Sequence, residues 1–310
     1  MIVEVKNLVK RYDKLLALDH LNLSVEKGEI FGLLGPNGSG KTTAINCILS
    51  LLKYDKGSIE IFGKSMRPDA YDIKRDIGVI MQNVAVFEEL TVYENISYFC
   101  SLYIKDKNEV KRLTDEAIAF VSLEDYKKFV PKKLSGGLLR RLNIACGVAH
   151  KPKLIILDEP TVAVDPQSRN KILEGIRNLN ENGATIIYTT HYMEEVEQLC
   201  SRIAIIDKGK VIATGTKDEL KGMISLGEKI TVEAYNLKED QIEDILHISN
   251  ISFVNYKDNQ LEIKSKKGKN NLIHVLDYLQ SHEVNFGKIY TEMPTLNDVF
   301  LEITGKELRD

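Results

Sequence analysis

The sequence predicts an α/β protein with two domains, and three observations support this prediction. A glycine-rich stretch at 35–42, GPNGSGKT, joins a short apolar run to a helical pattern, and a second apolar run at 154–160, LIILDEP, ends in two acids. Apolar runs of strand length alternate with stretches in which apolar residues recur every three or four positions, which is typical of a sheet covered by helices. With 310 residues and 43% apolar content, the chain can form one large core and a small second domain.

The N-terminal part is predicted to begin as sheet. Alternating or β-rich runs at 3–12, 21–35 and 57–63 are separated by glycine and charged turns. The first helix is expected at 42–52, directly after the glycine-rich loop, and a compact apolar strand is expected at 76–81. The loop therefore lies between a strand and a helix.

A helical lobe, about residues 88–150, is predicted as an insertion into the α/β core. Apolar residues recur at helical spacing in three stretches, 91–104, 108–123 and 135–150. Core patterns then return in the following order: a strand at 153–159, a helix at 167–182 closed by Gly183, a strand at 184–191, a helix at 193–200 and a hairpin at 204–215. We therefore predict a mixed sheet with an inserted lobe, in a first domain of residues 1–225.

A second, smaller α+β domain is predicted for residues 226–310. Its strand and helix patterns follow the order βαββαβ, with a turn at Lys257, Asp258 and Asn259. This order suggests a ferredoxin-like domain. A helix is expected at 270–282, and a last helix at 296–304 is closed by Gly305.

Charge and composition argue against several functions. The net charge is -3 and the basic residues form no stripe, so nucleic acid is not expected as a partner. The four cysteines lie far apart in apolar stretches, which favours buried thiols in a reducing cytosol. The start does not resemble a secretory signal, and no window approaches the ~20 apolar residues of a membrane-spanning helix. Any membrane role therefore requires another subunit.

The glycine-rich loop predicts a phosphate-binding site. Its glycines let backbone N–H groups approach phosphate oxygens, and the following helix adds its positive end. Lys41 is expected to reach the β and γ phosphates, Thr42 to bind Mg²⁺ and Thr43 to contact the α-phosphate. The alternative is a glycine-rich turn without a ligand, which the flanking strand and helix disfavour. The residues expected to hold the nucleotide here are Gly35, Pro36, Asn37, Gly38, Ser39, Gly40, Lys41, Thr42 and Thr43.

Two acids end the buried strand at 153–159, at the sheet edge where ligands of open α/β folds bind. Asp158 is assigned to Mg²⁺, through water, and Glu159 to the general base that polarises the attacking water. The alternative is a pair of helix-capping acids. A phosphate loop in the same chain favours the catalytic interpretation.

Two further polar residues are expected at this edge. His191 ends the strand at 184–191, and its imidazole is expected to point toward the γ-phosphate, although a lone histidine there is usually a polar cap. Gln82 follows the strand at 76–81, and its amide can contact both the metal and the water. We therefore add both to the predicted catalytic residues, and Gln82 to the metal ligands.

The motif LSGG at 134–137 has no role inside a single ATP site. Ser135 is expected to cap the next helix, while Gly136 and Gly137 let backbone N–H groups face outward. This arrangement predicts a second phosphate contact, toward a nucleotide held by another subunit. A capped helix start is the alternative.

Together these motifs resemble those of the ATP-binding subunits of ABC transporters, over about residues 3–220. The resemblance implies ATP and Mg²⁺ as cofactors and assigns the family's motifs to positions here. The Walker A loop is 35–43, the Q-loop residue Gln82, the signature 134–137, Walker B Asp158 with Glu159, the D-loop residue Asp165 and the switch histidine His191. Tyr12 takes the position of the aromatic residue that stacks on adenine, with a surface tyrosine as the alternative.

In this family two subunits close head to tail, so Ser135 and Gly137 of one face the γ-phosphate bound by Lys41 of the other. The resemblance thus implies an ATP-dependent dimer, of this chain with itself or with a different ATPase subunit. Two residues depart from the family's pattern: Leu138 stands where Gln is frequent, and Ala163 where Gly is usual. They leave the catalytic groups in place and bear on the rate and on the coupling between sites.

The C-terminal stretch, PTLNDVFLEITGKEL, is similar to the tails of ATPase subunits of ABC-2 type exporters. This similarity implies export of a drug, antimicrobial or lipid-like substrate by separate membrane permease subunits, with the ATPase on the cytoplasmic face of the membrane. The permease is expected to contact residues 84–98, with Phe87, Glu88 and Tyr93 as candidates, or else these residues only pack the lobe.

Two other functions remain as alternatives. The chain could serve a membrane-linked complex that senses or regulates the cell envelope, or act as a soluble ABC protein on ribosomes or DNA. Soluble ABC proteins usually carry two ATPase cassettes or a long coiled-coil insertion, and this sequence has neither, nor a basic face. The sequence therefore favours the exporter ATPase.

Overall fold

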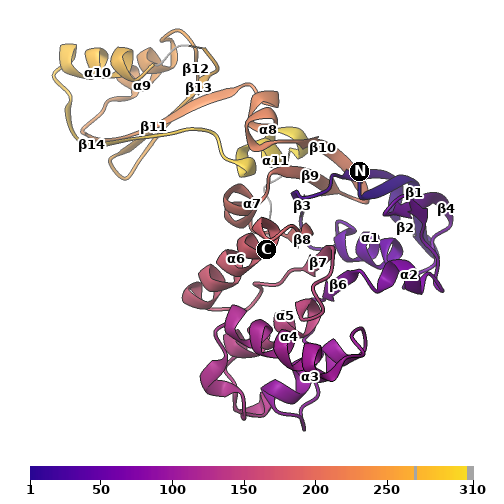
Figure 1. Ribbon diagram of the computed structural model, residues 1–310. Helices are drawn as coiled ribbons and strands as arrows, with labels where there is room; N and C mark the ends of the chain where they lie inside the picture. Colours follow the sequence, from indigo (N-terminus) through magenta and orange to yellow (C-terminus); the bar gives the residue numbers. More distant parts are fainter. Residues whose placement is uncertain (269–270, 306–310) are drawn as a thin grey trace. The chain divides into compact units, whose positions relative to one another are not determined.

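The computed structural model describes residues 1–268 and 271–305, which fold as two compact units, Met1–Lys217 and the described residues from Asp218 onward (Figure 1). Asn270, which begins the helix predicted at 270–282, and residues 306–310 of the predicted second domain lie outside the described residues. Neither unit shares a sheet with the other and each has its own buried core, so each is described by itself.

The first unit contains two sheets. An antiparallel sheet has the order β2-β1-β4-β5, formed by β1 (Val3–Tyr12), β2 (Leu15–Val25), β4 (Lys56–Ile61) and β5 (Lys64–Ser65). The central sheet has the order β10-β9-β3-β8-β7-β6, formed by β3 (Ile30–Leu34), β6 (Ile77–Ile80), β7 (Leu154–Asp158), β8 (Thr185–Thr190), β9 (Arg202–Asp207) and β10 (Lys210–Gly215). Neighbouring strands from β9 to β6 are parallel and β10 is antiparallel to β9. The predicted mixed sheet is therefore confirmed.

The helices of the first unit cover this sheet and form the predicted lobe. Those of the core are α1 (Lys41–Ile48), α2 (Tyr71–Lys74), α6 (Pro166–Glu181) and α7 (Met193–Leu199). Those of the lobe are α3 (Val92–Ser101), α4 (Lys107–Phe120) and α5 (Gly136–Val148), which gather at one end of the unit in Figure 1. The helix predicted at 42–52 ends at Ile48, because the chain turns away at Ser50, where φ is +50°.

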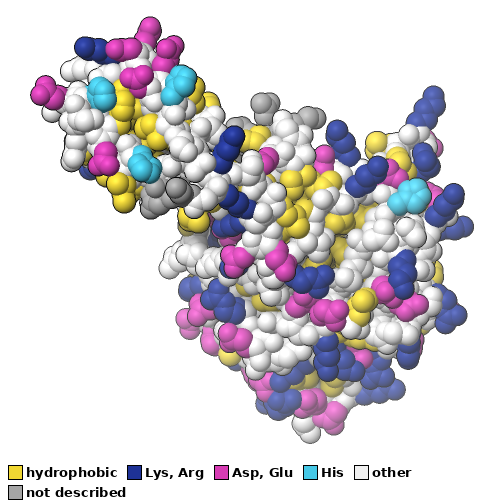
Figure 2. Space-filling view, turned by 90° about the horizontal axis from the view of Figure 1, so that it is seen from above, with side chains coloured by type: hydrophobic (Ala, Val, Ile, Leu, Met, Phe, Trp, Pro, Cys, Tyr) yellow, Lys and Arg dark blue, Asp and Glu magenta, His cyan; other side chains and the backbone are white. Residues whose placement is uncertain are grey.

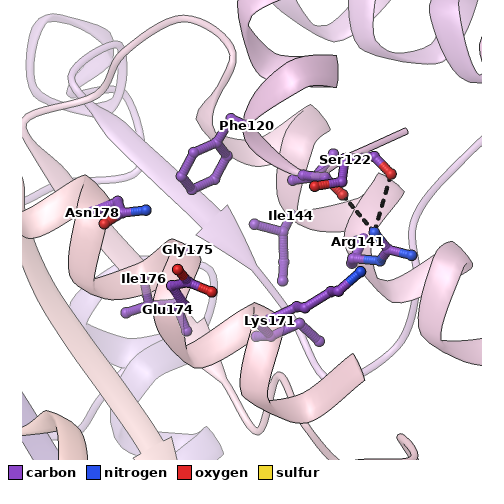
Figure 3. Close-up of a pocket in the computed structure, with 11 residues that line it drawn as sticks. Phe120, Ser122, Arg141, Ile144, Lys171, Glu174, Gly175, Ile176 and Asn178 are labelled. Carbon is purple, nitrogen blue, oxygen red and sulfur yellow. Dashed lines mark hydrogen bonds between the residues drawn. The ribbon is translucent and has the colours of Figure 1, made fainter. Parts of the chain in front are cut away.

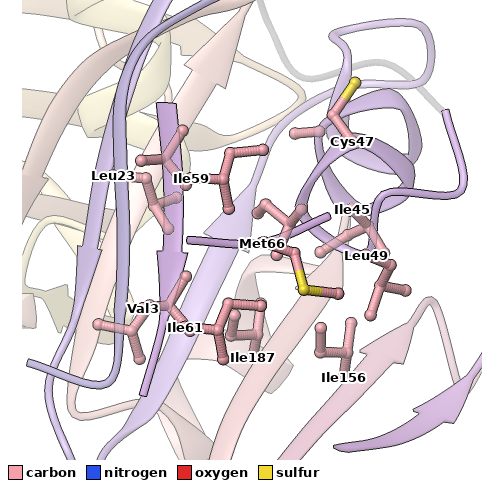
Figure 4. Close-up of a cluster of buried hydrophobic side chains, with 14 of the residues drawn as sticks. Val3, Leu23, Ile45, Cys47, Leu49, Ile59, Ile61, Met66, Ile156 and Ile187 are labelled. Carbon is pink, nitrogen blue, oxygen red and sulfur yellow. The ribbon is translucent and has the colours of Figure 1, made fainter. Parts of the chain in front are cut away.

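One apolar core joins the two sheets through α1 (Figure 4). Ile45 of α1 is fully buried, in the same core as Ile61 of the antiparallel sheet and Ile156 of the central sheet. Each such side chain contributes about 1.5–3 kcal/mol when buried. This packing fixes the first turn of α1, and with it the glycine-rich loop that precedes the helix.

The second unit has the predicted ferredoxin-like topology. It begins with α8 (Lys217–Met223), most of which lies in this unit, and continues with β11 (Leu226–Tyr235), α9 (Glu239–Leu246), β12 (Ile251–Lys257), β13 (Gln260–Lys266), α10 (Leu272–Ser281), β14 (Asn285–Glu292) and α11 (Leu296–Thr304). All pairings in its sheet, of order β12-β13-β11-β14, are antiparallel. Helices α9 and α10 pack on one face through Ile245, Val275 and Leu279.

Two local sequence signals are confirmed in this unit. Asp258 and Asn259, in the turn between β12 and β13, both have positive φ, 51° and 61°, which suits a tight hairpin turn. Gly305 ends α11 in the left-handed conformation, with φ of 68°. The α8 helix, by contrast, is not among the predicted elements.

The surface mixes both signs of charge. Figure 2 shows Lys and Arg side chains interspersed with Asp and Glu over the visible face of the first unit. Along residues 1–268 and 271–305, no helix combines the length and the apolar character that crossing a membrane requires.

Candidate nucleotide-binding site

The glycine-rich loop lies between β3 and α1, as predicted, and its geometry requires glycine. Gly40 has φ of 108°, and a Cβ there would lie only 2.8 Å from the carbonyl oxygen of Ala17. The hydroxyl of Ser39 is buried and has no hydrogen-bond partner among the described residues. A buried hydroxyl without a partner is costly, so a ligand oxygen beside it would be stabilising.

Lys41, Glu159 and His191 meet in one buried cluster. The Lys41 Nζ lies 3.1 Å from Glu159 Oε1, and His191 Nδ1 lies 3.0 Å from Glu159 Oε2. Each of the three side chains is less than a tenth exposed. The Lys41 ammonium also donates to the carbonyl oxygens of Gly35 and Pro36, at 2.8 and 3.2 Å. The fold thus brings together three predicted site residues that are far apart in the sequence.

Glu159 is held in an uncommon backbone conformation. Its φ is 49°, in the left-handed region that non-glycine residues rarely adopt, and its N–H donates to the Thr189 carbonyl at 3.1 Å. Strain of this kind costs on the order of 1–3 kcal/mol and persists only where the surroundings enforce it. The carboxylate is thereby aimed at Lys41 and His191.

Asp158 ends β7 among hydroxyl groups. Thr42 donates to Asp158 Oδ2 at 2.9 Å, and Thr189 donates to Asp158 Oδ1 at 2.5 Å. Asp158 is fully buried. Carboxylate and hydroxyl oxygens are the donors that Mg²⁺ prefers, so Thr42 and Asp158 fit the predicted metal site.

Three predicted residues lie apart from these contacts. Within the part of the chain that the structure describes, no hydrogen bond or ion pair connects the side chains of Tyr12, Gln82 or Ser135 to Lys41 or Glu159. Tyr12 is 45% exposed at the end of β1, and the Lys10 ammonium lies 5.2 Å from its ring centroid. An exposed ring can accept a planar base.

The segment around Gln82 is anchored by α5, the helix that follows the signature motif. Arg140 donates to the backbone carbonyl oxygens of Met81 and Gln82, at 3.2 and 2.8 Å. Asn143, one turn later, accepts the N–H of Ala85 at 3.0 Å. The amide side chain of Gln82 itself is exposed. The Q-loop and the signature helix are thus linked directly.

The signature motif begins α5 as predicted. Ser135 is the N-cap and accepts the N–H of Leu138 at 3.3 Å, while a Cβ built on Gly136 would meet open space. Gly137 is different, because a Cβ there would lie 2.3 Å from Ser168 Oγ and 3.1 Å from Asp165 Oδ2. The signature glycine therefore packs against the start of α6, which follows the D-loop.

The D-loop is capped and strained. Asp165 caps α6 by accepting the N–H of Ser168 at 2.9 Å, and this hydrogen bond lowers the pKa of the Asp165 carboxyl. Ala163 has φ of 58°, in the left-handed region, at the position where the family usually has Gly. The departure noted from the sequence therefore coincides with a backbone conformation that glycine adopts without strain.

A separate cavity of about 220 Å³ lies between α4, α5 and α6 (Figure 3). Arg141 reaches from α5 to the end of α4 and donates to the carbonyl oxygens of Val121 and Ser122. Phe120 lies over Gly175 of α6. None of the predicted nucleotide-binding residues lines this cavity.

Several residues that contribute to the site were not predicted from the sequence. Thr189 contacts Asp158, and its sequence signal is weak, because β8 contains other hydroxyl residues, Thr185, Tyr188 and Thr190. Arg140 and Asn143 follow the signature motif by a few positions in a predicted helix. Helical spacing alone fits ordinary surface and core residues there equally well, so it gives no sign of their contacts with the Q-loop. Their roles depend on segments more than 50 residues away.

A glycine-rich loop before α1, buried acids at the end of β7 and a buried histidine after β8 define a P-loop ATPase core, here joined to a separate ferredoxin-like unit. A protein-family model described as "ABC transporter" matches residues 18–162, and one described as "ATP-binding protein DrrA1-3-like, C-terminal domain" matches residues 215–304. The chain belongs to the ATP-binding subunits of ABC transporters and is an ATPase of that family, with a DrrA-like C-terminal domain.

Similar proteins match the chain along its length. The linearmycin resistance ATP-binding protein LnrL of Bacillus subtilis is 37% identical, with 100% of each chain covered. The daunorubicin resistance ATP-binding protein DrrA3 of Streptomyces coeruleorubidus is 34% identical, covering 99% of this chain and 97% of the relative. The solved dimeric structure of MJ0796, a bacterial ABC transporter cassette, is 29% identical with a TM-score of 0.65, covering 69% of this chain and 98% of that one.

Proposed function

We propose that this chain is the ATPase subunit of an ABC-2 type exporter and that it powers transport through separate membrane permease subunits. The observation that carries the proposal is the match along both units to resistance ATP-binding proteins, including the DrrA-like C-terminal domain. A Nod factor export ATP-binding protein of Burkholderia thailandensis is also 34% identical over 99% of this chain, so drug-resistance and export proteins share this build.

The site residues fit ATP and Mg²⁺. The loop from Gly35 to Thr43 would hold the phosphates, with the buried Ser39 hydroxyl and the Lys41 ammonium facing them. Thr42 and Asp158 would hold the metal together with the Gln82 amide, and Tyr12 would stack on the base. When bound, Mg²⁺ would neutralise charge on the β and γ phosphates.

Glu159 would act as the general base, and its contacts suggest how its activity is controlled. Its two carboxylate oxygens face Lys41 and His191, so both are engaged. When the Lys41 ammonium turns to a γ-phosphate, it leaves Glu159 Oε1 free to accept a proton from water. His191, on the other carboxylate oxygen, would then hold Glu159 in position and contact the phosphate as the family implies.

Hydrolysis would require two subunits head to tail. Ser135, Gly136 and Gly137 lie at the N-terminus of α5. The free backbone N–H groups and the positive end of the helix dipole favour binding of an anion at such a position. The signature motif of one subunit would thus contact the γ-phosphate bound by Lys41 of the other. The ATP-binding cassette MJ0796 is a dimer in a post-hydrolysis state bound to ADP and Pi, and this similar structure supports the arrangement.

The contact with the permease is proposed at the loop between β6 and α3. Phe87 is 43% exposed and packs against Tyr98, with ring centroids 5.0 Å apart, so an aromatic cluster faces solvent there. Asn95 holds the loop from inside, accepting the N–H of Phe87 at 2.8 Å and donating to its carbonyl at 3.0 Å.

The other two candidates for the permease contact are Glu88 and Tyr93. Glu88 pairs with Lys132 at 3.1 Å, an exposed ion pair that a partner could replace. The third candidate, Tyr93, is half-buried in the first turn of α3.

The test is reconstitution. We expect the tagged chain to co-purify with a polytopic membrane protein, and Phe87→Ser to reduce that yield while its own ATPase activity stays intact. In proteoliposomes we expect ATP-dependent movement of a lipophilic antibiotic probe such as daunorubicin. Recovery with ribosomes and without a membrane partner would refute the proposal. ATPase activity stimulated by the probe without its movement would indicate signalling in place of export.

A further inference from the structure

We propose that Glu195 is a positioning residue for ATP hydrolysis: its buried carboxylate holds the segment after Glu159, the strand β8 that precedes His191 and the helix α6 that follows the D-loop in one fixed arrangement. Glu195 belongs to α7, and none of the motifs predicted from the sequence includes it.

The Glu195 carboxylate is buried, and one of its two oxygens accepts three hydrogen bonds. The residue is 2% exposed. Its Oε2 atom accepts hydrogen bonds from Tyr188 at 2.7 Å, Thr161 at 2.9 Å and Thr190 at 3.1 Å. Its Oε1 atom lies 3.4 Å from the Arg169 Nε, within ion-pair distance. The three hydroxyl residues are fully buried as well.

Two of the donors stand beside predicted catalytic groups. Thr161 follows Glu159 by two residues. Thr190 directly precedes His191, and its Oγ1 also accepts the N–H of Tyr192 at 3.0 Å. The Glu195 carboxylate is therefore linked to Glu159 through Thr161 and to His191 through Thr190, and these two residues contact each other.

Arg169 extends the same network to the D-loop. It lies in the first turn of α6, which Asp165 caps, and its guanidinium carbon is 4.8 Å from the ring centroid of Tyr192. Tyr192 in turn contacts His191, with ring centroids 4.1 Å apart. Arg169 thus packs between Glu195 and the residue next to the switch histidine. In a head-to-tail dimer, which rests on the proposed function, this path would connect the D-loop of a subunit to its own His191.

The chemistry favours a geometric role over a stabilising one. Removing a carboxylate from water is unfavourable, and an apolar side chain of similar size is often at least as stable at a buried position. What the carboxylate adds is a fixed geometry, because three hydroxyls converge on its Oε2 atom while Oε1 faces the Arg169 guanidinium at ion-pair distance, without a hydrogen bond. Burial and the neighbouring Glu195 carboxylate raise the pKa of Tyr188, so its hydroxyl remains a donor.

The test compares the full-length chain with Glu195→Gln and Arg169→Gln. Glu195→Gln keeps an acceptor for the hydroxyls but loses the charge that faces Arg169. We expect kcat to fall on the order of 10- to 100-fold while KM and the affinity for a fluorescent ATP analogue change less than about twofold, because displacement by about 1 Å costs catalysis more than binding. The matched control is Glu194→Gln, on the same helix and exposed, which should behave as wild type.

A double-mutant cycle tests the connection. If Arg169 acts through Glu195, the double variant should have the same kcat as Glu195→Gln alone, and Glu195→Asp should recover part of the activity. Should Glu195→Gln fail to fold, Thr190→Val and Arg169→Gln carry the same prediction. Parallel losses of kcat, analogue binding and melting temperature would show a merely structural role and overturn the proposal, as would a kcat within about twofold of wild type. All of these variants are measured by the ATPase activity of the chain without a permease, so the role of Glu195 is tested independently of the proposed role in export.

Discussion

Gly137 has a steric role inside its own subunit that can be separated from its predicted contact with a second subunit. In Gly137→Ala, the new Cβ would lie 2.3 Å from Ser168 Oγ and 2.8 Å from Ser168 Cβ. The hydroxyl can rotate away, but the Cβ of Ser168 is fixed by the backbone of α6. Carbon atoms in contact normally lie about 3.5–4.0 Å apart, so α5 and α6 must separate by several tenths of an ångström.

Two opposing terms set the expected magnitude. Overpacking of this kind costs about 1–3 kcal/mol, whereas replacing Gly by Ala inside a helix gains about 1 kcal/mol. In the wild-type background Gly137→Ala should therefore destabilise the first unit by up to about 2 kcal/mol. In a Ser168→Gly background both clashing atoms are gone, and the same change should be neutral or stabilising by up to about 1 kcal/mol.

The assay is urea unfolding of the full chain followed by circular dichroism, since the sequence contains no Trp. The four proteins are wild type, each single variant and the double variant, and the quantity of interest is the coupling energy. Ser168→Ala, which removes only the hydroxyl, is the matched intermediate. If Gly137→Ala costs the same in both backgrounds to within about 0.5 kcal/mol, the steric argument is wrong. If the double variant is stable but its ATPase activity stays low, the loss of activity cannot come from the steric clash. It would then be assigned to the contact of the signature motif with the second subunit.

Three further predictions follow from single residues. Ala163→Gly should relieve about 1–2 kcal/mol of left-handed strain, less about 0.4–1 kcal/mol of unfolded-state entropy, and so raise the melting temperature by up to a few degrees; a decrease would contradict the strain at this position. Lys41→Met should abolish binding of an ATP analogue and destabilise the chain by roughly 3 kcal/mol, because the buried Glu159 loses the ammonium beside Oε1 and keeps only its contact with His191. Adding Glu159→Gln should restore the melting temperature without restoring binding. Burial lowers the pKa of His150 to about 4, so the unfolded chain takes up a proton that the folded chain excludes. The contribution of His150 to stability should therefore be fully present above about pH 6.5 and be lost as the pH falls from there toward 4. His150→Phe, which retains the stack on Tyr103, should show a smaller difference in melting temperature between about pH 7.5 and 5.5 than wild type.

The chain's order of elements was largely predictable because its signals are local. Glycine at 305, the turn at 258–259 and the apolar runs of β3, β7 and β8 act through residues within one or two turns of themselves. The elements β5 and α2 were not predicted, because segments of two and four residues carry too little periodic pattern. The helix α8 was also not predicted. The end of α1 was predicted too late in the chain, since apolar residues continue past Ile48 while the backbone turns at Ser50.

The sequence by itself determined the chemistry of this protein: a phosphate loop, paired acids, a strand-end histidine and a signature motif, each recognisable within a few residues. Only the tertiary structure decided which groups meet. It joins Lys41 to Glu159, from opposite halves of the ATPase sequence, and gathers Thr161, Arg169 and Tyr188 on Glu195. The physical reason is that a buried charge is stable only beside its partners, and packing brings those partners from distant segments. Which groups pair therefore leaves no pattern that is detectable locally along the chain.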